Sequence, residues 1–380
     1  MDIKFIIKAL LWISRILFGV VFIFSGFVKA IDPLGSTYKF QDYFLAFGTE
    51  WLFPTALPLA IFMSSLELII GVTVLLGIRM KESAWGALLF MAFFTPLTLY
   101  IAIFEPVSDC GCFGDALIIS NWATFYKNVF ILAAAIFIFI HRNTFSPLWS
   151  GRKDWYLVVL ITLFSVWLSI YSLRNLPMLD FRPWKVGNNI EQMRQPIQEE
   201  VAEFFFIYRN TNTGETREFP VNDLPSADDG WEFVDRREVI IQEFIEAPID
   251  DFVIMDEFGF DMAETYLSNP DYQFLLIAYD LRRTNTRVFE RKINEFAAKA
   301  ENNGVSFIVL TGSSLEDIDV FRHQMQAAYP FYQADPIKLK TIVRSNPGLV
   351  LMKDWVVKAK WAHRNIPEFE RVEEKYMNRN

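Results

Sequence analysis

The sequence predicts a multi-pass α-helical membrane bundle of about five transmembrane helices, followed by a water-soluble C-terminal α/β domain. Hydrophobic residues occupy 52% of the 380 positions, and 38 positions are Phe. Residues 1–173 carry 11 Lys and Arg against 10 Asp and Glu, whereas residues 174–380 carry 25 against 35. A nearly uncharged apolar half is typical of membrane spans, and an acidic half is typical of a soluble domain. The acidic balance argues against nucleic acid as a partner.

Five stretches are long and apolar enough to cross about 30 Å of hydrocarbon as helices, which rise about 1.5 Å per residue. They cover residues 9–28, 56–78, 84–104, 123–140 and 155–171. Helix is the expected form because a chain in lipid must satisfy its own backbone hydrogen bonds. The first stretch follows Lys4 and Lys8 and resembles a signal peptide. Its length and the interruption at Arg15 favour a retained span.

Lys and Arg in the short loops predict the orientation, because these residues remain on the cytoplasmic side. They cluster at the N-terminus and after the second and fourth spans, at Lys4, Lys8, Arg79, Lys81, Arg142, Arg152 and Lys153. The loop from Glu105 to Asn121 has three acidic residues and no Lys or Arg. We therefore expect a bacterial inner membrane protein with a cytoplasmic N-terminus. The loop and the C-terminal half are expected in the periplasm, although Lys29 and Lys39 in the first external loop weaken the pattern.

Two ionisable residues, Arg15 and Glu67, fall inside predicted spans, where a charge is costly and usually has a partner. One interpretation is a polar intramembrane site for a substrate, a proton or a quinone head group. The alternative is structural: the two side chains pair and hold two helices together, or Arg15 extends to the cytoplasmic side.

The two cysteines of the chain, Cys110 and Cys112, lie two positions apart in the loop expected outside the cytoplasm. Thiols there can be oxidised, and a small, strained disulfide is of the labile or catalytic kind. Gly111 and Gly114 allow the tight backbone turns of the loop. A redox-active pair, a static disulfide and metal ligation with the neighbouring carboxylates all remain open. Asp109 and Asp115 are expected to raise the pKa of the thiols, and a metal is disfavoured because the three histidines are distant in sequence.

Several motifs in the first third of the chain resemble known membrane families. The segments RILFG (15–19) and FSGFVKAIDP (24–33), then Tyr43 and Phe44, are similar to the opening of the DoxX family, and ELIIG (67–71) resembles its second span. The segment DCGCFG (109–114) resembles the methylamine-utilisation MauE family of redox-associated membrane proteins. The resemblance covers about residues 5–142 and implies a four-helix bundle connected with disulfide formation or periplasmic enzyme maturation. Proteins of this type with a long C-terminal extension resemble those of Bacteroidetes.

The soluble half begins with a linker and a small β-rich segment, expected at residues 176–250. Strands at 204–208 and 217–221 flank a turn at 210–214, which predicts a hairpin, and 239–244 is a further strand. From residue 251 onward, apolar strands alternate with helices. Strands are predicted at 252–255, 273–279, 305–310, 348–352 and 356–361, and helices at 287–300, 314–328, 335–343 and 368–377.

This order of elements resembles the thioredoxin fold over residues 250–366. The segment RSNPGLVLMKD (344–354) is similar to the cis-proline segment of that family and places Pro347 at the cis position. The family carries Cys-x-x-Cys after its first central strand, but here residues 280–286 contain no Cys. The expected organisation is a bundle at 1–142, a fifth span at 143–175, the linker, and a thioredoxin-like domain at 251–380 that cannot perform thiol chemistry itself.

These observations lead to three functional hypotheses. In the first, a redox-associated membrane protein cycles Cys110 and Cys112 between dithiol and disulfide. It assists thiol–disulfide exchange or maturation of an extracytoplasmic protein partner. A quinone in the bundle could accept the electrons, but no residue pattern in the sequence identifies a quinone site. In the second, the protein is a non-enzymatic membrane anchor or assembly factor with structural cysteines. In the third, it transports a small solute by means of Arg15 and Glu67.

Overall fold

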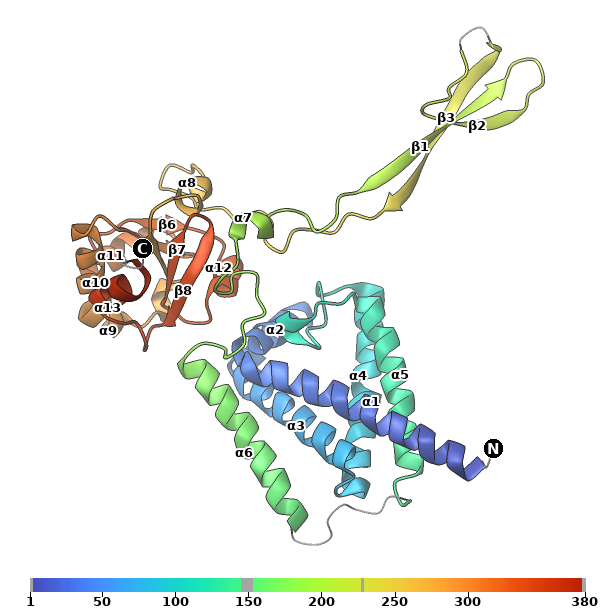
Figure 1. The fold of residues 1–380 in the computed structure, drawn as a ribbon, viewed down its shortest axis with the longest axis horizontal. Coiled ribbons are helices and arrows are strands. Elements are labelled where there is room, and N and C mark those ends of the chain that lie inside the picture. The colour runs from blue at the N-terminus through green and yellow to red at the C-terminus, as the bar shows by residue number, and fades with distance from the viewer. Residues whose placement is uncertain (1–2, 145–152, 227–228, 378–380) are drawn as a thin grey trace.

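The computed structural model describes residues 3–144, 153–226 and 229–377. It confirms the predicted fold class, a membrane bundle followed by a region of sheets and helices (Figure 1). Five helices in the described residues are long and apolar enough to cross a membrane: α1 (Ile3–Ile31), α3 (Ala56–Leu76), α4 (Met80–Phe104), α5 (Asn121–Ile140) and α6 (Lys153–Arg174). Arg152, expected in a cytoplasmic loop, lies outside the described residues.

The bundle is held together by a close crossing of α1 and α3. A Cβ atom at Gly26 would lie 2.7 Å from the backbone nitrogen of Leu68, and one at Gly71 would lie 2.8 Å from that of Ile23. Small residues allow this approach, which brings van der Waals packing where lipid removes the hydrophobic drive for association. Buried side chains of α4 and α5 complete one core with α1 and α3, and α6 packs on the other side of that pair.

A short helix that the sequence analysis did not predict closes one end of the bundle. Helix α2 (Pro33–Ala46) begins where Asp32 accepts a hydrogen bond from the backbone N–H of Gly35. Asp followed by Pro is a known helix start, so Asp32 and Pro33 did carry a signal. The same end holds the 3₁₀ turns η1 (Glu50–Thr55) and η2 (Gly114–Ala116), the second of which lies in the cysteine loop.

The soluble half contains a five-stranded sheet in the order β6-β5-β4-β7-β8. Its strands are β4 (Gln273–Ile277), β5 (Ser306–Thr311), β6 (Phe331–Gln333), β7 (Gly348–Lys353) and β8 (Val356–Ala362). Strands β4, β5 and β6 are parallel, whereas β7 runs antiparallel to β4 and to β8. The predicted strand at 252–255 is wrong: Phe252 and Ile254 are core residues, and only Met255 bridges to Gln333.

Helices cover both faces of this sheet, which explains why its central strands are continuous apolar runs. One face carries η4 (Leu281–Arg283), α9 (Thr286–Val288), η5 (Phe289–Ile293), α10 (Asn294–Asn302), α11 (Leu315–Met325), α13 (Phe369–Val372) and η6 (Glu373–Met377). The other carries α7 (Ile190–Met193), α8 (Ala263–Leu267) and α12 (Pro336–Ile342). Trp184 and Ile190 are buried in this second core, so the chain joins the α/β unit well before residue 251.

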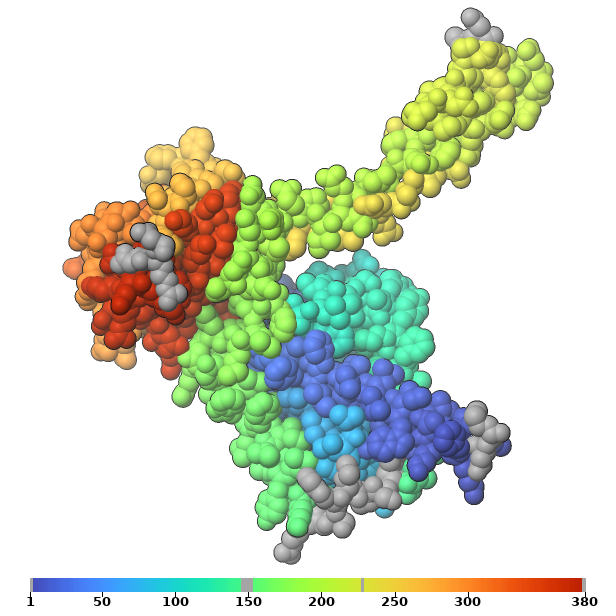
Figure 2. Space-filling view, in the orientation of Figure 1, coloured from blue at the N-terminus to red at the C-terminus, as the bar shows by residue number. Residues whose placement is uncertain are grey.

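A separate three-stranded sheet projects away from both the bundle and the α/β unit (Figures 1 and 2). It is formed by β1 (Val201–Asn210), β2 (Thr216–Pro220) and β3 (Trp231–Gln242) in the order β2-β1-β3. The predicted hairpin is the β1–β2 pair. Tyr208, Phe219 and Trp231 form edge-to-face ring contacts on its surface, so this sheet is stabilised by cross-strand aromatic pairs rather than by a covering layer.

A buried arginine joins the two halves of the molecule. Arg344 precedes the cis Asn346–Pro347 bond, and its side chain is only 5% exposed. It lies 2.9 Å from Asp32 Oδ2 and 2.7 Å from Asp115 Oδ2, both in the membrane half. Burial works against its charge, but the two carboxylates outweigh burial and raise the pKa of Arg344. The α/β unit is thereby fixed against the end of the bundle that holds the cysteine loop.

We predict that Arg344→Met detaches the α/β unit from the bundle. The substitution leaves two carboxylates without their cation, and breaking a buried pair in this way costs about 3–5 kcal/mol. Hydrogen–deuterium exchange should therefore rise in α2 and in the cysteine loop, while the sheet of the α/β unit keeps its protection. The control is Arg287→Met, since Arg287 is exposed. Unchanged exchange in α2 and the loop would show that docking does not depend on Arg344.

Candidate functional site

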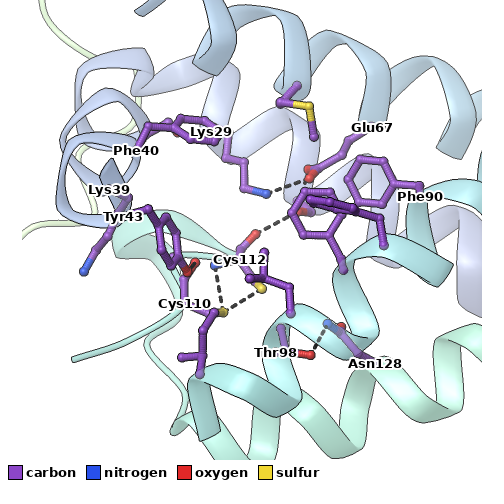
Figure 3. Close-up of a pocket in the computed structure, with 18 of the residues that line it drawn as sticks. Lys29, Lys39, Phe40, Tyr43, Glu67, Phe90, Thr98, Cys110, Cys112 and Asn128 are labelled. Atoms are coloured by element: carbon purple, nitrogen blue, oxygen red, sulfur yellow. Dashed lines mark hydrogen bonds and ion pairs between the residues drawn. The ribbon is translucent and has the colours of Figure 1, made fainter. Parts of the chain in front are cut away.

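A large cavity lies inside the bundle, directly beside the cysteine loop. Its volume is about 670 Å³, and its wall is formed by α1, α2, α3, α4, α5 and the loop. Most lining residues are aromatic or aliphatic, among them Phe22, Phe40, Phe44, Phe90, Phe94, Met63, Met91 and Leu97. The polar and reactive groups are fewer: Ser25, Lys29, Ser36, Lys39, Tyr43, Thr49, Glu67, Thr98, Cys110, Cys112, Lys127 and Asn128. Figure 3 shows Lys29, Tyr43 and Glu67 together with the two cysteines of the loop. Such a site suits a mainly apolar ligand with a small polar part.

Cys110 and Cys112 are free thiols with their sulfur atoms 2.6 Å apart, joined by a hydrogen bond. Both residues are half-buried and line the cavity. Gly111 between them has φ +64° and Gly114 has φ +52°, a backbone region that favours glycine. A side chain at Gly111 would also meet Lys39, because a Cβ atom would lie 2.9 Å from Lys39 Cγ. The two glycines thus let the loop fold back so that both sulfurs face each other.

The surroundings of the two sulfurs differ. The hydrogen bond between the two thiols, followed by contacts with Thr124 Oγ1 at 3.5 Å and with the Cys112 backbone N–H at 3.3 Å, lowers the pKa of Cys110 to about 6. Burial raises the pKa of Cys110, but the hydrogen bonds lower it by more. The same thiol–thiol hydrogen bond, together with burial, raises the pKa of Cys112. One sulfur of the pair is therefore stabilised as a thiolate and the other as a thiol.

The carboxylates beside the pair do not act as the sequence suggested. Asp109 and Asp115 were expected to raise the pKa of both thiols, and this expectation is wrong for Cys110. Asp109 Oδ2 lies 2.5 Å from Lys39 Nζ, and Asp109 Oδ1 accepts the backbone N–H of Gly111. Asp115 is paired with Arg344. Each carboxylate is neutralised by a cation, so both shape and anchor the loop instead of repelling a thiolate.

A second ion pair crosses the cavity wall between α1 and α3. Lys29 Nζ lies 2.7 Å from Glu67 Oε1, and Ser25 Oγ lies 2.7 Å from both Glu67 Oε2 and the carbonyl oxygen of Cys112. The pair is thus connected to the cysteine loop through one hydroxyl. Lys29 and Lys39, which weakened the charge pattern of the first external loop, are both paired with carboxylates at this end of the bundle.

The proposed Arg15–Glu67 pair is wrong. Arg15 donates hydrogen bonds to the carbonyl oxygens of Val74 and Leu75, and its guanidinium lies over the ring of Trp12. It therefore holds α1 against the C-terminal end of α3, where helix carbonyls lack partners within the helix. Glu67 lines the cavity, whereas Arg15 does not. Arg15 therefore stabilises the C-terminal end of α3, whereas Glu67 lies at the cavity.

Three side chains that contact the cysteine loop were not predicted as site residues from the sequence. Lys127 and Thr124 on α5 approach the cysteine loop, and Tyr43 on α2 donates a hydrogen bond to the Cys110 carbonyl oxygen. Tyr43 belongs to the DoxX-like motif, and this motif could have indicated that Tyr43 is a site residue. Lys127 stands alone near the start of an apolar run, a position typical of a membrane-interface anchor. Nothing local in the sequence indicated that it faces the cysteines.

Comparison with known families agrees with this architecture. Residues 7–141, which form the bundle and the cysteine loop, match the family described as methylamine utilisation protein MauE. Residues 202–243 match a family described only as a domain of unknown function, DUF8463, and coincide with the projecting sheet of β1, β2 and β3. No curated protein and no solved structure matches the chain. The chain thus combines a membrane bundle that is similar to MauE with a C-terminal region of sheets and helices.

We predict that Glu67→Gln and Lys29→Met each destabilise the bundle, because each leaves the partner's charge buried without compensation. Breaking a buried pair typically costs about 3–5 kcal/mol, whereas removing both charges costs less. Thermal unfolding of the detergent-solubilised protein should therefore show a higher midpoint for the double variant than for either single variant. Additive losses in the double variant would contradict the pairing.

Proposed function

We propose that the protein is a redox-associated component of the bacterial inner membrane that exchanges disulfides with an extracytoplasmic protein through Cys110 and Cys112. The observation that carries the proposal is the facing pair of free thiols at the wall of an apolar cavity, with one sulfur stabilised as a thiolate. A static, structural pair has no need of a depressed pKa, whereas thiol–disulfide exchange proceeds through the thiolate.

The proposed orientation places the cysteine loop and the α/β unit in the periplasm. Arg79 lies between α3 and α4 and Arg142 follows α5, whereas the cysteine loop joins the other ends of α4 and α5. The positive-inside rule assigns the end with these arginines to the cytoplasm. The contacts of Arg344 with Asp32 and Asp115 hold the α/β unit at the other end. The thiols and the soluble parts would then face the same oxidising compartment.

We further propose a lipid-soluble quinone as the electron acceptor. Phe47 and Phe93 line the cavity and are exposed on the outer surface of the bundle, so an apolar ligand could enter from the bilayer. The aromatic wall fits an isoprenoid tail, and Ser25, Lys29 and Lys127 offer polar groups to a quinone ring near the thiols. When bound, a quinone would accept the two electrons and two protons released when the dithiol becomes a disulfide.

The α/β unit would recruit the protein partner. Its strand order, with β7 antiparallel to β4, and its cis Asn346–Pro347 bond support the thioredoxin-like resemblance. Residues 280–286, which replace the Cys-x-x-Cys segment, lie beside this bond, since Asn346 donates a hydrogen bond to the carbonyl oxygen of Asp280. This face supplies no sulfur, so the thiol chemistry would belong to Cys110 and Cys112.

The test is to trap mixed disulfides in intact cells that express Cys110→Ser, Cys112→Ser or both substitutions. A single remaining cysteine cannot resolve the intermediate, so each single variant should accumulate a covalent complex with a partner protein that reducing agent releases. The double variant should form none.

The wild-type chain is the matched control, because its second thiol resolves the complex rapidly. Normal function of the double variant, together with the absence of any trapped complex in the single variants, would refute the proposal and favour an anchor or assembly factor.

A further inference from the structure

We propose that Lys127 is the positioning residue of the cysteine pair: it is the counter-ion of the thiolate that the pair carries at Cys110. The inference rests on the proposed thiol–disulfide function and specifies which sulfur carries the negative charge during exchange. It is carried by the arrangement of charges around the cavity and by the placement of α5 against the cysteine loop.

Lys127 differs from the other lysines of the cavity because it has no carboxylate partner within salt-bridge distance in the described residues. Lys29 is paired with Glu67, and Lys39 with Asp109. Lys127 Nζ instead lies 4.2 Å from the ring centroid of Phe113, the residue that follows Cys112. A cation in an apolar environment requires compensation. Among the described residues that line the cavity, the thiolate is the anionic group that is not already paired with another cation.

The placement of Lys127 follows from the geometry of α5. Thr124 and Lys127 are three positions apart and therefore lie on the same face of the helix. Thr124 Oγ1 is 3.5 Å from Cys110 Sγ, and the ring of Phe113 holds the ammonium group beside the same loop. The aromatic face attracts the cation without neutralising it. Lys127 can thus balance a thiolate while remaining at the wall of the cavity.

Charged and titratable groups from every neighbouring element surround the pair. They are Lys29 on α1, Asp42, Lys39 and Tyr43 on α2, Glu67 on α3, Asp109 and Asp115 in the loop, and Lys127 on α5. Glu67, Asp109 and Asp115 are already paired, each with a cation. The positive charge of Lys127 is therefore available to the cysteine pair. Its electrostatic effect favours a thiolate at either sulfur, and the contacts of Cys110 with Thr124 Oγ1 and the Cys112 backbone N–H place that thiolate on Cys110.

This assignment defines the exchange step. When a partner thiolate attacks Cys112 Sγ of the oxidised pair, a bond forms between these two sulfurs and the Cys110–Cys112 bond breaks. The negative charge that arrives with the partner departs on Cys110, where Lys127 balances it. In the reverse direction Cys110 is the attacking thiolate. A sulfur with a lower pKa is the better leaving group, so the same cation assists both directions.

The test measures the rate at which iodoacetamide alkylates each cysteine of the reduced, full-length protein in lipid nanodiscs between pH 5 and 9. In the wild type, Cys110 should react first, with a midpoint near the pKa of about 6. Lys127→Met should raise that midpoint, because the thiolate loses its counter-ion. A rise of about one unit would slow Cys110 alkylation at pH 6 roughly fivefold. Lys127→Arg should keep the wild-type profile, since the positive charge is retained.

Lys81→Met is the matched control, since Lys81 begins α4 at the opposite end of the bundle, and it should leave the profile unchanged. An unaltered profile in Lys127→Met, or Cys112 reacting before Cys110 in the wild type, would overturn the assignment. The readout needs no protein partner and no acceptor. Failure to trap a mixed disulfide in cells would therefore refute the proposed function without affecting the alkylation result. An alkylation profile that does not depend on Lys127 would overturn the role of Lys127 without refuting the proposed function.

Discussion

The arrangement of the molecule depends on one buried cation, the guanidinium of Arg344. It joins Asp32 at the corner between α1 and α2 to Asp115 in the cysteine loop, across the boundary of the membrane and soluble halves. Planar bidentate donors suit this role, because one arginine can satisfy two carboxylates at once. Tyr38 on α2 adds weaker contacts to the α/β unit, since its hydroxyl lies 3.4 Å from that of Tyr279 and its ring lies 4.7 Å from Lys340 Nζ. Through Asp115, Arg344 links the cysteine loop to the segment of the α/β unit that contains Pro347.

The same principle, a charge compensated inside an apolar environment, organises the cavity. Glu67 is held by Lys29 and Ser25, and Asp109 by Lys39. These pairs neutralise the carboxylates that would otherwise oppose a thiolate, and they leave Lys127 as surplus positive charge near the cysteine loop. The low pKa of Cys110 comes first from its hydrogen bond with Cys112 and then from Thr124, the Cys112 backbone N–H and Lys127. Formation of the disulfide would remove the thiolate and return Lys127 to an uncompensated state, in which an electron-rich oxygen of an acceptor would be favoured.

Local patterns in the sequence predicted the helices and strands. They could not predict contacts between residues that are far apart in the sequence. The apolar runs predicted the five spans, and the spacing of Cys110 and Cys112 drew attention to a loop that borders the cavity. The helix-to-helix pairing was assigned wrongly, because an apolar run shows that a helix is buried in lipid but not which face meets which neighbour. Glu67 therefore seemed a partner for Arg15, although Ser25 and Lys29 lie one turn apart on the face of α1 that meets it. Arg344 and Asp32 are 312 positions apart and share no local signal.

The central claim is that electrons pass between the cysteine pair and a lipid-soluble acceptor in the cavity. The most direct measurement adds a short-chain quinone to the reduced protein in nanodiscs and follows quinone absorbance and free thiols together. The account predicts that two thiols disappear for each quinone reduced. It also predicts that the double variant with serine at positions 110 and 112 reduces none. Quinone that remains oxidised while both thiols stay free, or quinone reduction that persists in the double variant, would contradict it.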